Sequence, residues 1–430
     1  AGRSYSAGQL GFVVLSALLP PLGFAIARRV SGNERRAWLA GLLLLFSGFY
    51  FPVWTAIDTF APCARCGALG RLAGWRARDG GGWRWSLGAG ARGGLAHLTR
   101  ADGPLLPAAV AMVCTVRAFY DARPGARGRS AVVRVAWLAC GYLLVMAPWF
   151  LRNVQATGAP LPAGGGRTMW LQSYNQIFSY GAELSWQSYR AWGWGPAARS
   201  KLWAGWINLQ PLFAVQGLIV AFFPALAGWW QLKKHPLFQM ALLYALLLLG
   251  AMTLVFTFPG PRGALFHSGG AMLPCVLSAA AQGLDAAVDF AARKRPTWNR
   301  RAARRLFGGA LVVFAAAISL YVYAGRLKQV NYRNDAYPQI ATYLAGQQAT
   351  VMIGNPPAYL YHGGYRAISV PNEPLETTLR VADRYGATYL ALDDDHPPPL
   401  EPYVLGGAAH PRLHAEKRFA GPVILYRIEP

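Results

Sequence analysis

The chain consists largely of long apolar runs separated by short polar turns. A helix that crosses a bilayer needs about 17–25 apolar residues. The strongest runs are Gln9–Ala27, Ala37–Val53, Pro104–Val116, Ala131–Phe150, Leu209–Trp230, Leu237–Phe258, Ala271–Phe290 and Phe307–Gly325, and two weaker ones are Phe60–Gly74 and Trp85–Leu98. The pattern predicts a polytopic α-helical membrane protein with about ten spans.

The pattern changes after Gly325, where strand and helix signals alternate. Short strands are predicted at Thr350–Ile353, Ala367–Val370, Thr388–Leu392 and Phe419–Arg427, with a helix at Leu375–Tyr385. We therefore expect a transmembrane domain over residues 1–325 and a soluble α/β domain over 326–430. The chain contains neither a Walker phosphate loop nor a Rossmann glycine fingerprint.

The distribution of charge gives the predicted orientation. The net charge is +24, but residues 326–430 carry ten basic and ten acidic residues, so the excess lies in the first 325. The basic residues there gather in alternate loops: Arg28–Arg36, Arg71–Arg84, Arg117–Arg134, Lys233–Lys234 and Arg293–Arg305. By the positive-inside rule these loops are cytoplasmic, which makes the loop 151–206 external and the C-terminal domain extracytoplasmic. A nucleic-acid partner is excluded, because its binding would need one basic face on a soluble fold.

The stretch from Cys63 to Gly94 is unusually rich in Gly, Arg and Trp. Arginines interrupt its apolar runs, and an arginine near the bilayer centre costs about 2.5–3.5 kcal/mol. A local frameshift across roughly Cys63–Trp75 is one hypothesis, and a polar-lined span that faces the bundle interior is the alternative. The spacing Cys63-Ala-Arg-Cys66 lacks the second pair that a zinc site needs, and no disulfide framework is expected.

Acidic residues are scarce in the membrane part, and few of them are predicted to be external. Asp58 lies at the outer mouth of a span, in PVWTAIDTF. An ionisable group at such a depth is a functional candidate, although an aspartate that caps the next helix is the alternative. Arg100 and Asp102 share a tight external turn, where the pair either holds a phosphate or stabilises the turn.

Other polar side chains are predicted at the same outer mouth. Arg152 and Asn153 follow the aromatic exit of a span, and Arg262 and His267 lie in a turn shaped by Pro and Gly. These residues suit an anionic lipid head group. Tyr174 belongs to an aromatic external loop, whose rings stack on sugars or lie at the lipid interface. The acidic run at 393–396 reads as a solvated turn rather than a cation site.

Three segments carry a resemblance to a known family: AGLLLLFSGFYFPVWTAIDTF, GLAHLTRADGPLL and APWFLRNVQATGAPLP, followed by the C-terminal domain. The chain resembles bacterial GT-C glycosyltransferases, related to protein O-mannosyltransferases and aminoarabinose transferases. Such enzymes take a sugar from a polyprenyl-phosphate carrier at the outer face and invert the anomeric centre. Their principal catalytic acid lies in the first external loop, and nothing here matches it. We therefore expect that an N-terminal piece precedes Ala1 and that this fragment lacks that acid.

The resemblance implies an inverting hexosyl- or pentosyltransferase in a bacterial inner or plasma membrane. Arg100, Arg152 and Arg262 would bind the donor phosphate, and Asp58 would assist as a catalytic carboxylate. The expected partners are a lipid-linked sugar donor, a glycan, lipid or protein acceptor, and membrane lipids. No cofactor is expected, and the need for a divalent metal stays open. The alternatives are a transporter or flippase of a lipid-linked saccharide, and a non-catalytic membrane scaffold.

Overall fold

The computed structural model describes residues 4–121, 127–295, 297–328, 331–404 and 408–429. Two compact units make up the chain. Unit 1 comprises Ala1–Met169 and Trp192–Arg326, and unit 2 comprises Trp170–Ala191 and Leu327–Pro430. Residues 170–191, which the sequence analysis counts with the membrane domain, thus pack with the C-terminal unit.

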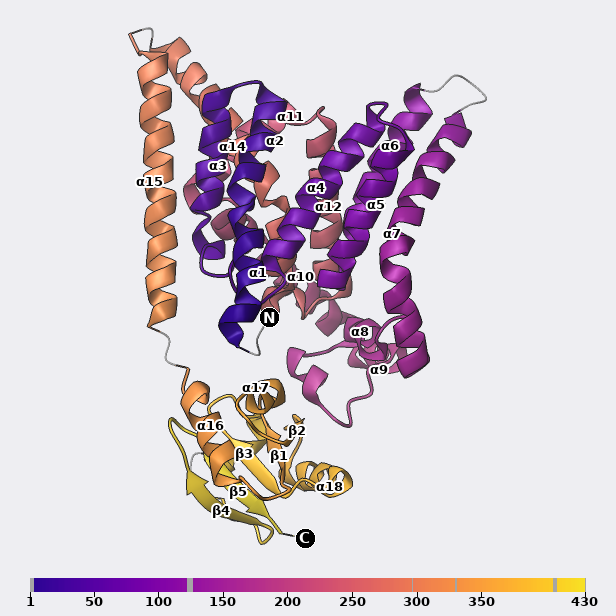
Figure 1. Ribbon diagram of the computed structural model, residues 1–430, viewed down its shortest axis with the longest axis vertical. Coiled ribbons are helices and arrows are strands. Elements are labelled where there is room, and N and C mark those ends of the chain that lie inside the picture. The colour runs from indigo at the N-terminus through magenta and orange to yellow at the C-terminus, as the bar shows by residue number, and fades with distance from the viewer. Residues whose placement is uncertain (1–3, 122–126, 296, 329–330, 405–407, 430) are drawn as a thin grey trace. The chain divides into compact units, whose positions relative to one another are not determined.

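Unit 1 is a bundle of helices (Figure 1). Its main helices are α1 (Tyr5–Ala17), α2 (Leu19–Ser31), α3 (Glu34–Leu45), α4 (Phe60–Arg78), α5 (Trp83–Thr99), α6 (Leu105–Asp121), α7 (Arg127–Thr157), α10 (Trp194–Pro211), α11 (Phe222–Leu232), α12 (Pro236–Gly250), α14 (Leu273–Lys294) and α15 (Arg300–Leu327); α8 (Ala163–Arg167) and α13 (Leu265–Gly269) are single turns.

Within the described residues, five helical stretches are long and apolar enough to cross a membrane: Tyr5–Ser31, Ala131–Thr157, Pro236–Val255, Gly260–Lys294 and Arg300–Leu327. A pair bent by 97°, Trp194–Gln216 with Ile219–Leu232, makes a sixth if it is one span. The prediction of a mostly helical, multi-pass membrane protein is confirmed. The number of ten spans stays a prediction, because α3, α4 and α5 are shorter or less apolar.

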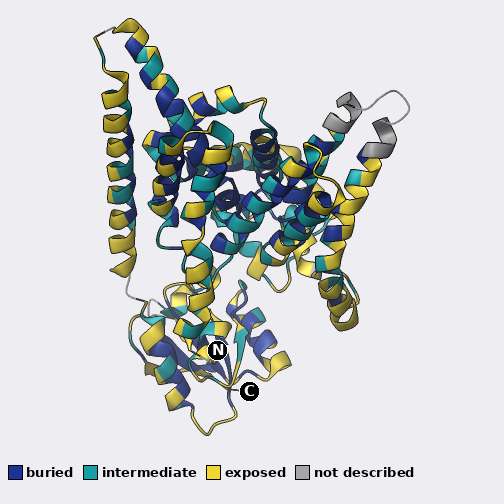
Figure 2. Cartoon of the chain, turned by 45° about the horizontal axis from the view of Figure 1, so that its top comes forward, coloured by how far each residue is buried: buried dark blue, intermediate teal, exposed yellow. Residues whose placement is uncertain are grey.

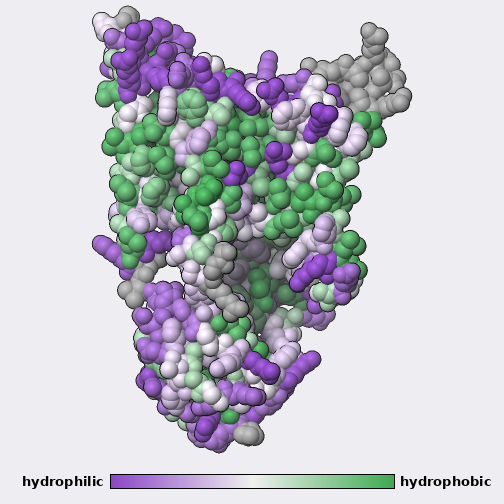
Figure 3. All heavy atoms as spheres, in the orientation of Figure 1, coloured by the Kyte–Doolittle hydropathy of each residue, from purple (hydrophilic) through white to green (hydrophobic). Residues whose placement is uncertain are grey.

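The basic turns predicted to be cytoplasmic lie at one end of unit 1. Helices α2, α4 and α14 all end there (Figure 1), and hydrophilic side chains gather above a band of hydrophobic ones (Figure 3). The predicted basic loop Arg117–Arg134 includes residues 122–126, which lie outside the described residues. The turns before α4 and after α5 lie at the opposite ends of these same helices.

Small residues let the helices of the suspected frameshift region pack closely. A Cβ added at Gly90 of α5 would lie 1.8 Å from the carbonyl oxygen of Leu138 on α7, and one at Gly141 would lie 2.0 Å from that of Leu87. At Gly67 of α4 it would lie 2.7 Å from the Ala271 side chain. Small residues at such crossings allow backbones to approach in membrane bundles. This packing agrees with the alternative of a polar-lined span that faces the bundle interior, while the frameshift stays a hypothesis.

Arg71 fits the same interpretation, because its side chain points into the bundle rather than to its surface. It is 1% exposed, and its Nη2 donates a hydrogen bond to the Ala271 carbonyl. Burial follows the inner faces of the helices, while their outer faces are exposed (Figure 2). The exposed outer faces carry large apolar side chains such as Leu144 and Val313, as expected for lipid contact.

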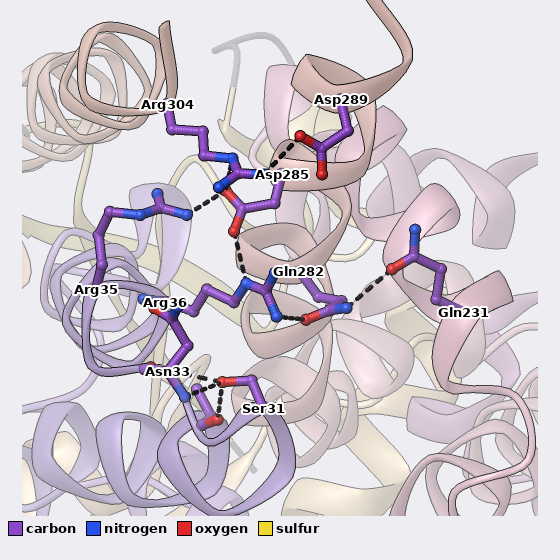
Figure 4. A network of polar contacts seen from close by, with 10 residues as sticks. Ser31, Asn33, Arg35, Arg36, Gln231, Gln282, Asp285, Asp289 and Arg304 are labelled. Atoms are coloured by element: carbon purple, nitrogen blue, oxygen red, sulfur yellow. Dashed lines mark hydrogen bonds and ion pairs between the residues drawn. The ribbon is translucent and has the colours of Figure 1, made fainter. Parts of the chain in front are cut away.

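A buried carboxylate ties the basic end of unit 1 together (Figure 4). Asp285 of α14 is 1% exposed. It forms ion pairs with Arg35, with Arg36 at 2.6 Å and with Arg304 at 3.7 Å, so that one carboxylate joins α3, α14 and α15. Arg36 also donates to Gln282, which donates to Gln231 of α11. The sequence places Asp285 near the cytoplasmic side but gives no sign that it is a junction.

Unit 2 is built on a five-stranded sheet in the order β2-β1-β3-β5-β4. The strands are β1 (Thr350–Ile353), β2 (Arg366–Ser369), β3 (Tyr389–Leu392), β4 (Leu413–Arg418) and β5 (Ile424–Ile428). The first three are parallel, with Met352 opposite Ile368 and Leu390, and β5 and β4 are antiparallel to their neighbours. Both β1 and β3 are buried throughout, as expected for parallel strands covered on two faces.

Helices cover both faces of this sheet. One face packs on α16 (Arg333–Tyr343) and α17 (Pro356–Tyr361), and the other on α18 (Leu375–Tyr385). The predicted strand Phe419–Arg427 is wrong at its start, because residues 419–423 form a hairpin turn with Gly421 at a φ of 69°. The preceding strand β4 was not predicted, since four of its six residues are charged or polar.

We predict that Gly90→Ala lowers the melting temperature of the detergent-solubilised protein. The added methyl group would meet the α7 backbone, and overpacking of this kind costs about 1–3 kcal/mol. Gly11→Ala in α1 is the matched control, because open space surrounds that position and Ala is the better helix former. Equal melting temperatures for the two variants would contradict close α5–α7 packing.

We also predict that Asp285→Asn destabilises unit 1 strongly, by about 3–5 kcal/mol, because it leaves three arginines without their shared counter-charge. Thermal unfolding followed by tryptophan fluorescence measures the loss. Glu34→Gln is the control, since Glu34 is an exposed acid on α3. A loss no greater than that of Glu34→Gln would show that Asp285 is not a structural junction.

Candidate functional site

Three segments of unit 1 bring polar side chains together at the ends of helices α4, α5 and α13. Asp58 and Thr59 precede α4, and Arg100 and Asp102 lie in the turn between α5 and α6. His267 and Ser268 lie on α13. The hydrogen bonds described below connect all six residues, which we call the polar cluster.

Arg100 forms the centre of the polar cluster. Its Nε donates to the Ser268 hydroxyl and lies 3.2 Å from Asp102 Oδ1, and the Ser268 hydroxyl in turn donates to Asp102 Oδ2. The side chains of Arg100 and Asp102 are 17% and 8% exposed. Burial of this kind is tolerated because the two charges compensate each other. The α5–α6 turn is thereby fixed to α13, 166 residues further along the chain.

The two Nη groups of Arg100 are held more loosely than its Nε. Nη1 lies 3.5 Å from the Thr59 hydroxyl, and Nη2 lies 3.4 Å from the Ala264 carbonyl. Both distances are at the long end of the range for hydrogen bonds. The outer edge of the guanidinium can therefore exchange these contacts for two shorter bonds to an oxyanion.

Asp58 and His267 form the second half of the polar cluster. Asp58 Oδ1 accepts from the Thr59 amide at 2.5 Å and lies 3.6 Å from His267 Nδ1, which is 3.3 Å from the Thr59 hydroxyl. Thr59 is the N-cap of α4, and no side chain caps that helix. The capping role considered for Asp58 is therefore not observed. Its side chain remains 39% exposed, so a ligand can reach it.

An aromatic layer supports the polar cluster. His267 stacks on Phe60 at a ring separation of 4.0 Å, and Phe60 lies edge-on to Phe266. Tyr50 stacks between Trp54 and Phe266 and donates to the Phe266 carbonyl at 2.6 Å. The buried Phe60 ring therefore covers one face of the His267 imidazole, and the buried Tyr50 supports it through Phe266.

A buried amide completes this support. Gln216 is 1% exposed and donates to the Tyr50 hydroxyl at 3.2 Å. A Cβ added at Gly269 would lie 2.1 Å from its Nε2, so this glycine permits the approach. Sequence reasoning missed Gln216, Tyr50, Thr59 and Ser268. Thr59 and Ser268 carried a signal only as the chain neighbours of the predicted Asp58 and His267.

The structure places the remaining predicted site residues elsewhere. Arg152 lies near the end of α7, over the Trp149 ring, and donates to Asn153, which is buried and donates to the Pro160 carbonyl. Arg262 is exposed, in the turn five residues before His267. Tyr174 belongs to unit 2, whereas the polar cluster belongs to unit 1.

No group of three His, Cys, Asp or Glu side chains with the geometry of a metal site occurs within the part of the chain that the structure describes. Cys63 and Cys66 are free thiols on α4. The acidic run at 393–395 is tied to Arg333, with Asp393 Oδ2 at 2.9 Å from its Nε.

No family model and no curated protein sequence matches the chain. Among solved structures, the apo form of ArnT from Cupriavidus metallidurans is similar, with 15% identity and a TM-score of 0.53 over 97% of this chain and 83% of that chain. The chain has the fold of the GT-C glycosyltransferases. The resemblance inferred from sequence is thus confirmed at the level of fold.

A second solved structure agrees. The Archaeoglobus fulgidus oligosaccharyltransferase in complex with Zn and sulfate is 12% identical, with a TM-score of 0.51 over 90% of this chain and 56% of that chain. The chain therefore spans little more than half the length of this archaeal protein. At these identities the likeness concerns the arrangement of helices, and the chemistry has to be argued from the side chains.

Proposed function

We propose that the chain is a membrane glycosyltransferase that moves a sugar from a polyprenyl-phosphate carrier to an acceptor at the outer face of the membrane. The observation that carries the proposal is the polar cluster, which combines an arginine with loosely held Nη groups and an accessible carboxylate–histidine pair. The GT-C fold, found in ArnT and in the archaeal oligosaccharyltransferase, supports it.

The orientation follows from charge. The basic turns lie at the opposite ends of the helices that carry the polar cluster, and such turns face the cytoplasm in membrane proteins. The polar cluster is then on the outer side, where a lipid-linked donor presents its head group. About ten spans and an extracytoplasmic unit 2 belong to the same proposal.

Arg100 is the residue that we assign to the donor phosphate. Its Nε is fixed by Ser268 and Asp102, so the guanidinium presents its Nη edge with little loss of side-chain entropy. Arg262 and Arg152 are assigned to the same anion from longer range, because in this orientation Arg262 lies on an external turn and Arg152 near the external end of α7. Asn153 holds the Arg152 side chain in place.

In the proposed step, a hydroxyl oxygen of the acceptor attacks the anomeric carbon. The bond between that carbon and the phosphate oxygen breaks, the phosphate leaves with the electron pair, and the configuration inverts. The acceptor hydroxyl loses its proton to a carboxylate. Asp58 either accepts this proton or orients the acceptor hydroxyl, and His267 holds Asp58 in place. The donor is a lipid-linked sugar, and the acceptor is a glycan, lipid or protein.

We predict that Arg100→Gln weakens binding of a polyprenyl-phosphate sugar about tenfold to a hundredfold, because charge-assisted hydrogen bonds contribute about 1.5–3 kcal/mol. Thermophoresis of the protein in nanodiscs measures the dissociation constant. Arg29→Gln, at an exposed arginine on α2 near the basic end, is the control. Equal binding by Arg100→Gln and Arg29→Gln would contradict the assignment.

We predict that Asp58→Asn leaves donor binding within twofold but lowers turnover by about a hundredfold or more, the usual contribution of acid–base groups. A radiolabelled transfer assay with the full-length protein measures the rate. Asp58→Glu should recover part of the rate, which a purely structural role would not give. Unchanged turnover in Asp58→Asn would remove the carboxylate from the mechanism.

A transporter of the lipid-linked saccharide is the second candidate, and the bent helix pair favours it. At the break, Leu218 and Ile219 have positive φ values of 46° and 58°, and the buried Gln216 lies beside it. Broken helices line the binding sites of many transporters. Proteoliposomes separate the two functions, since a transporter moves the intact lipid-linked sugar between leaflets and a transferase releases polyprenyl phosphate.

A further inference from the structure

Unit 2 contains a cavity of about 160 Å³. Three of its lining residues, Gly354, Val370 and Asp393, directly follow strands β1, β2 and β3. The lining also includes Asn175, Phe178, Asp395 and His396. The cavity therefore opens at the carboxyl ends of the three parallel strands.

The topology of the sheet explains why a cavity forms at this edge. The helix after β1, α17, covers one face of the sheet, and the helix after β2, α18, covers the other. After the neighbouring strands β1 and β2 the chain therefore turns to opposite faces of the sheet, and the loops that follow these two strands separate at this edge. In open α/β sheets this switch point is where ligands bind.

A segment from the long loop of the chain forms one wall of the cavity. The Asn372 amide donates to the Phe178 carbonyl at 2.8 Å, and the Ser179 hydroxyl donates to the Asn372 carbonyl at 3.1 Å. The Gly181 amide donates to Glu373 Oε1 at 3.0 Å. These bonds fix residues 178–181 beside the end of β2, so Asn175 and Phe178 are held facing the strand ends.

The polar groups of the cavity mainly accept hydrogen bonds. Asp393 is buried and paired with Arg333, which also lies 3.3 Å from Asp395 Oδ2. The Asp395 side chain nevertheless remains 83% exposed and keeps accepting capacity. His396 Nδ1 donates to the Asp393 carbonyl at 2.6 Å, which leaves Nε2 as an acceptor in the neutral ring.

This chemistry selects the class of ligand. Arg333 does not line the cavity, and two carboxylates do, so an anion would be repelled. The oxygen and nitrogen acceptors of carboxylate, imidazole and amide groups can accept hydrogen bonds from the hydroxyl groups of a polyol. The half-exposed ring of Phe178 offers an apolar face. The volume is below the 300–1,000 Å³ or so of drug-sized sites, so the ligand is small.

We propose that this cavity binds a neutral, hydroxyl-rich ring, namely a single sugar residue, either free or at the end of a glycan. Asp395, His396 and Asn175 accept its hydroxyl hydrogens, and Phe178 packs on its carbon face. The inference is separate from the proposed transfer reaction, because the site lies in unit 2 and its occupation requires no donor.

The test is saturation-transfer NMR on the full chain in detergent, with methyl glycosides of glucose, mannose and galactose as probes. Glucuronate tests the exclusion of anions, and a short neutral oligosaccharide distinguishes a terminal residue from a free sugar. We expect transfer to at least one neutral glycoside and none to glucuronate. Stronger binding of glucuronate, or no binding of any neutral probe, would overturn the proposal.

Variants locate the binding. Asp395→Asn and Asn175→Ala should each raise the dissociation constant of the bound glycoside about tenfold, the effect of losing one hydrogen bond to a sugar hydroxyl. Glu376→Gln, an exposed acid at the start of α18 outside the lining, should leave it unchanged. Melting curves show whether either variant is misfolded. If one is, the dissociation constant of the other variant decides the test. Binding equal to that of the natural chain in both variants would refute the assignment.

Discussion

The link between Arg100, Asp102 and Ser268 is the interaction on which the proposed site depends. It joins a turn near residue 100 to α13 near residue 268, and it compensates a positive and a negative charge that are both largely buried. An arginine whose Nε is held closely and whose Nη groups make only long contacts has a defined direction and can exchange the bonds at its far edge. The same bonds that stabilise the turn are the ones that, in the proposed function, direct Arg100 toward an oxyanion.

The remainder of unit 1 fixes the geometry around this link. Glycines on α5 and α7 bring those helices within backbone contact, which sets where the turn after α5 lies. At the basic end, Asp285 gathers three arginines from two other helices and prevents the mutual repulsion that they would otherwise exert. The bundle is thus held by close packing in its middle and by charge at both ends.

Much of this architecture can be predicted from the sequence, because membrane spans depend on apolar length and loop charge, which are local properties. Four site residues were predicted from the scarcity of acidic residues in the membrane part or from the chemistry of turns. The structure brings their side chains together: Asp58, Arg100, Asp102 and His267. Arg152 and Arg262 were predicted by the same reasoning, and no local signal distinguishes them from the four.

Gln216 and Asp285 were missed as partners, because their roles arise from contacts across more than 160 and 240 residues. The strand β4 was missed because edge strands carry charge.

The central claim is that the polar cluster of unit 1 binds the phosphate of a lipid-linked sugar. Photo-crosslinking of the full-length protein in nanodiscs, with a polyprenyl phosphate that carries a diazirine next to the phosphate, tests it most directly. Peptide mapping should find the label in the turn between α5 and α6 and in residues 259–268. Labelling confined to the basic turns at the other end of the helices would contradict the account.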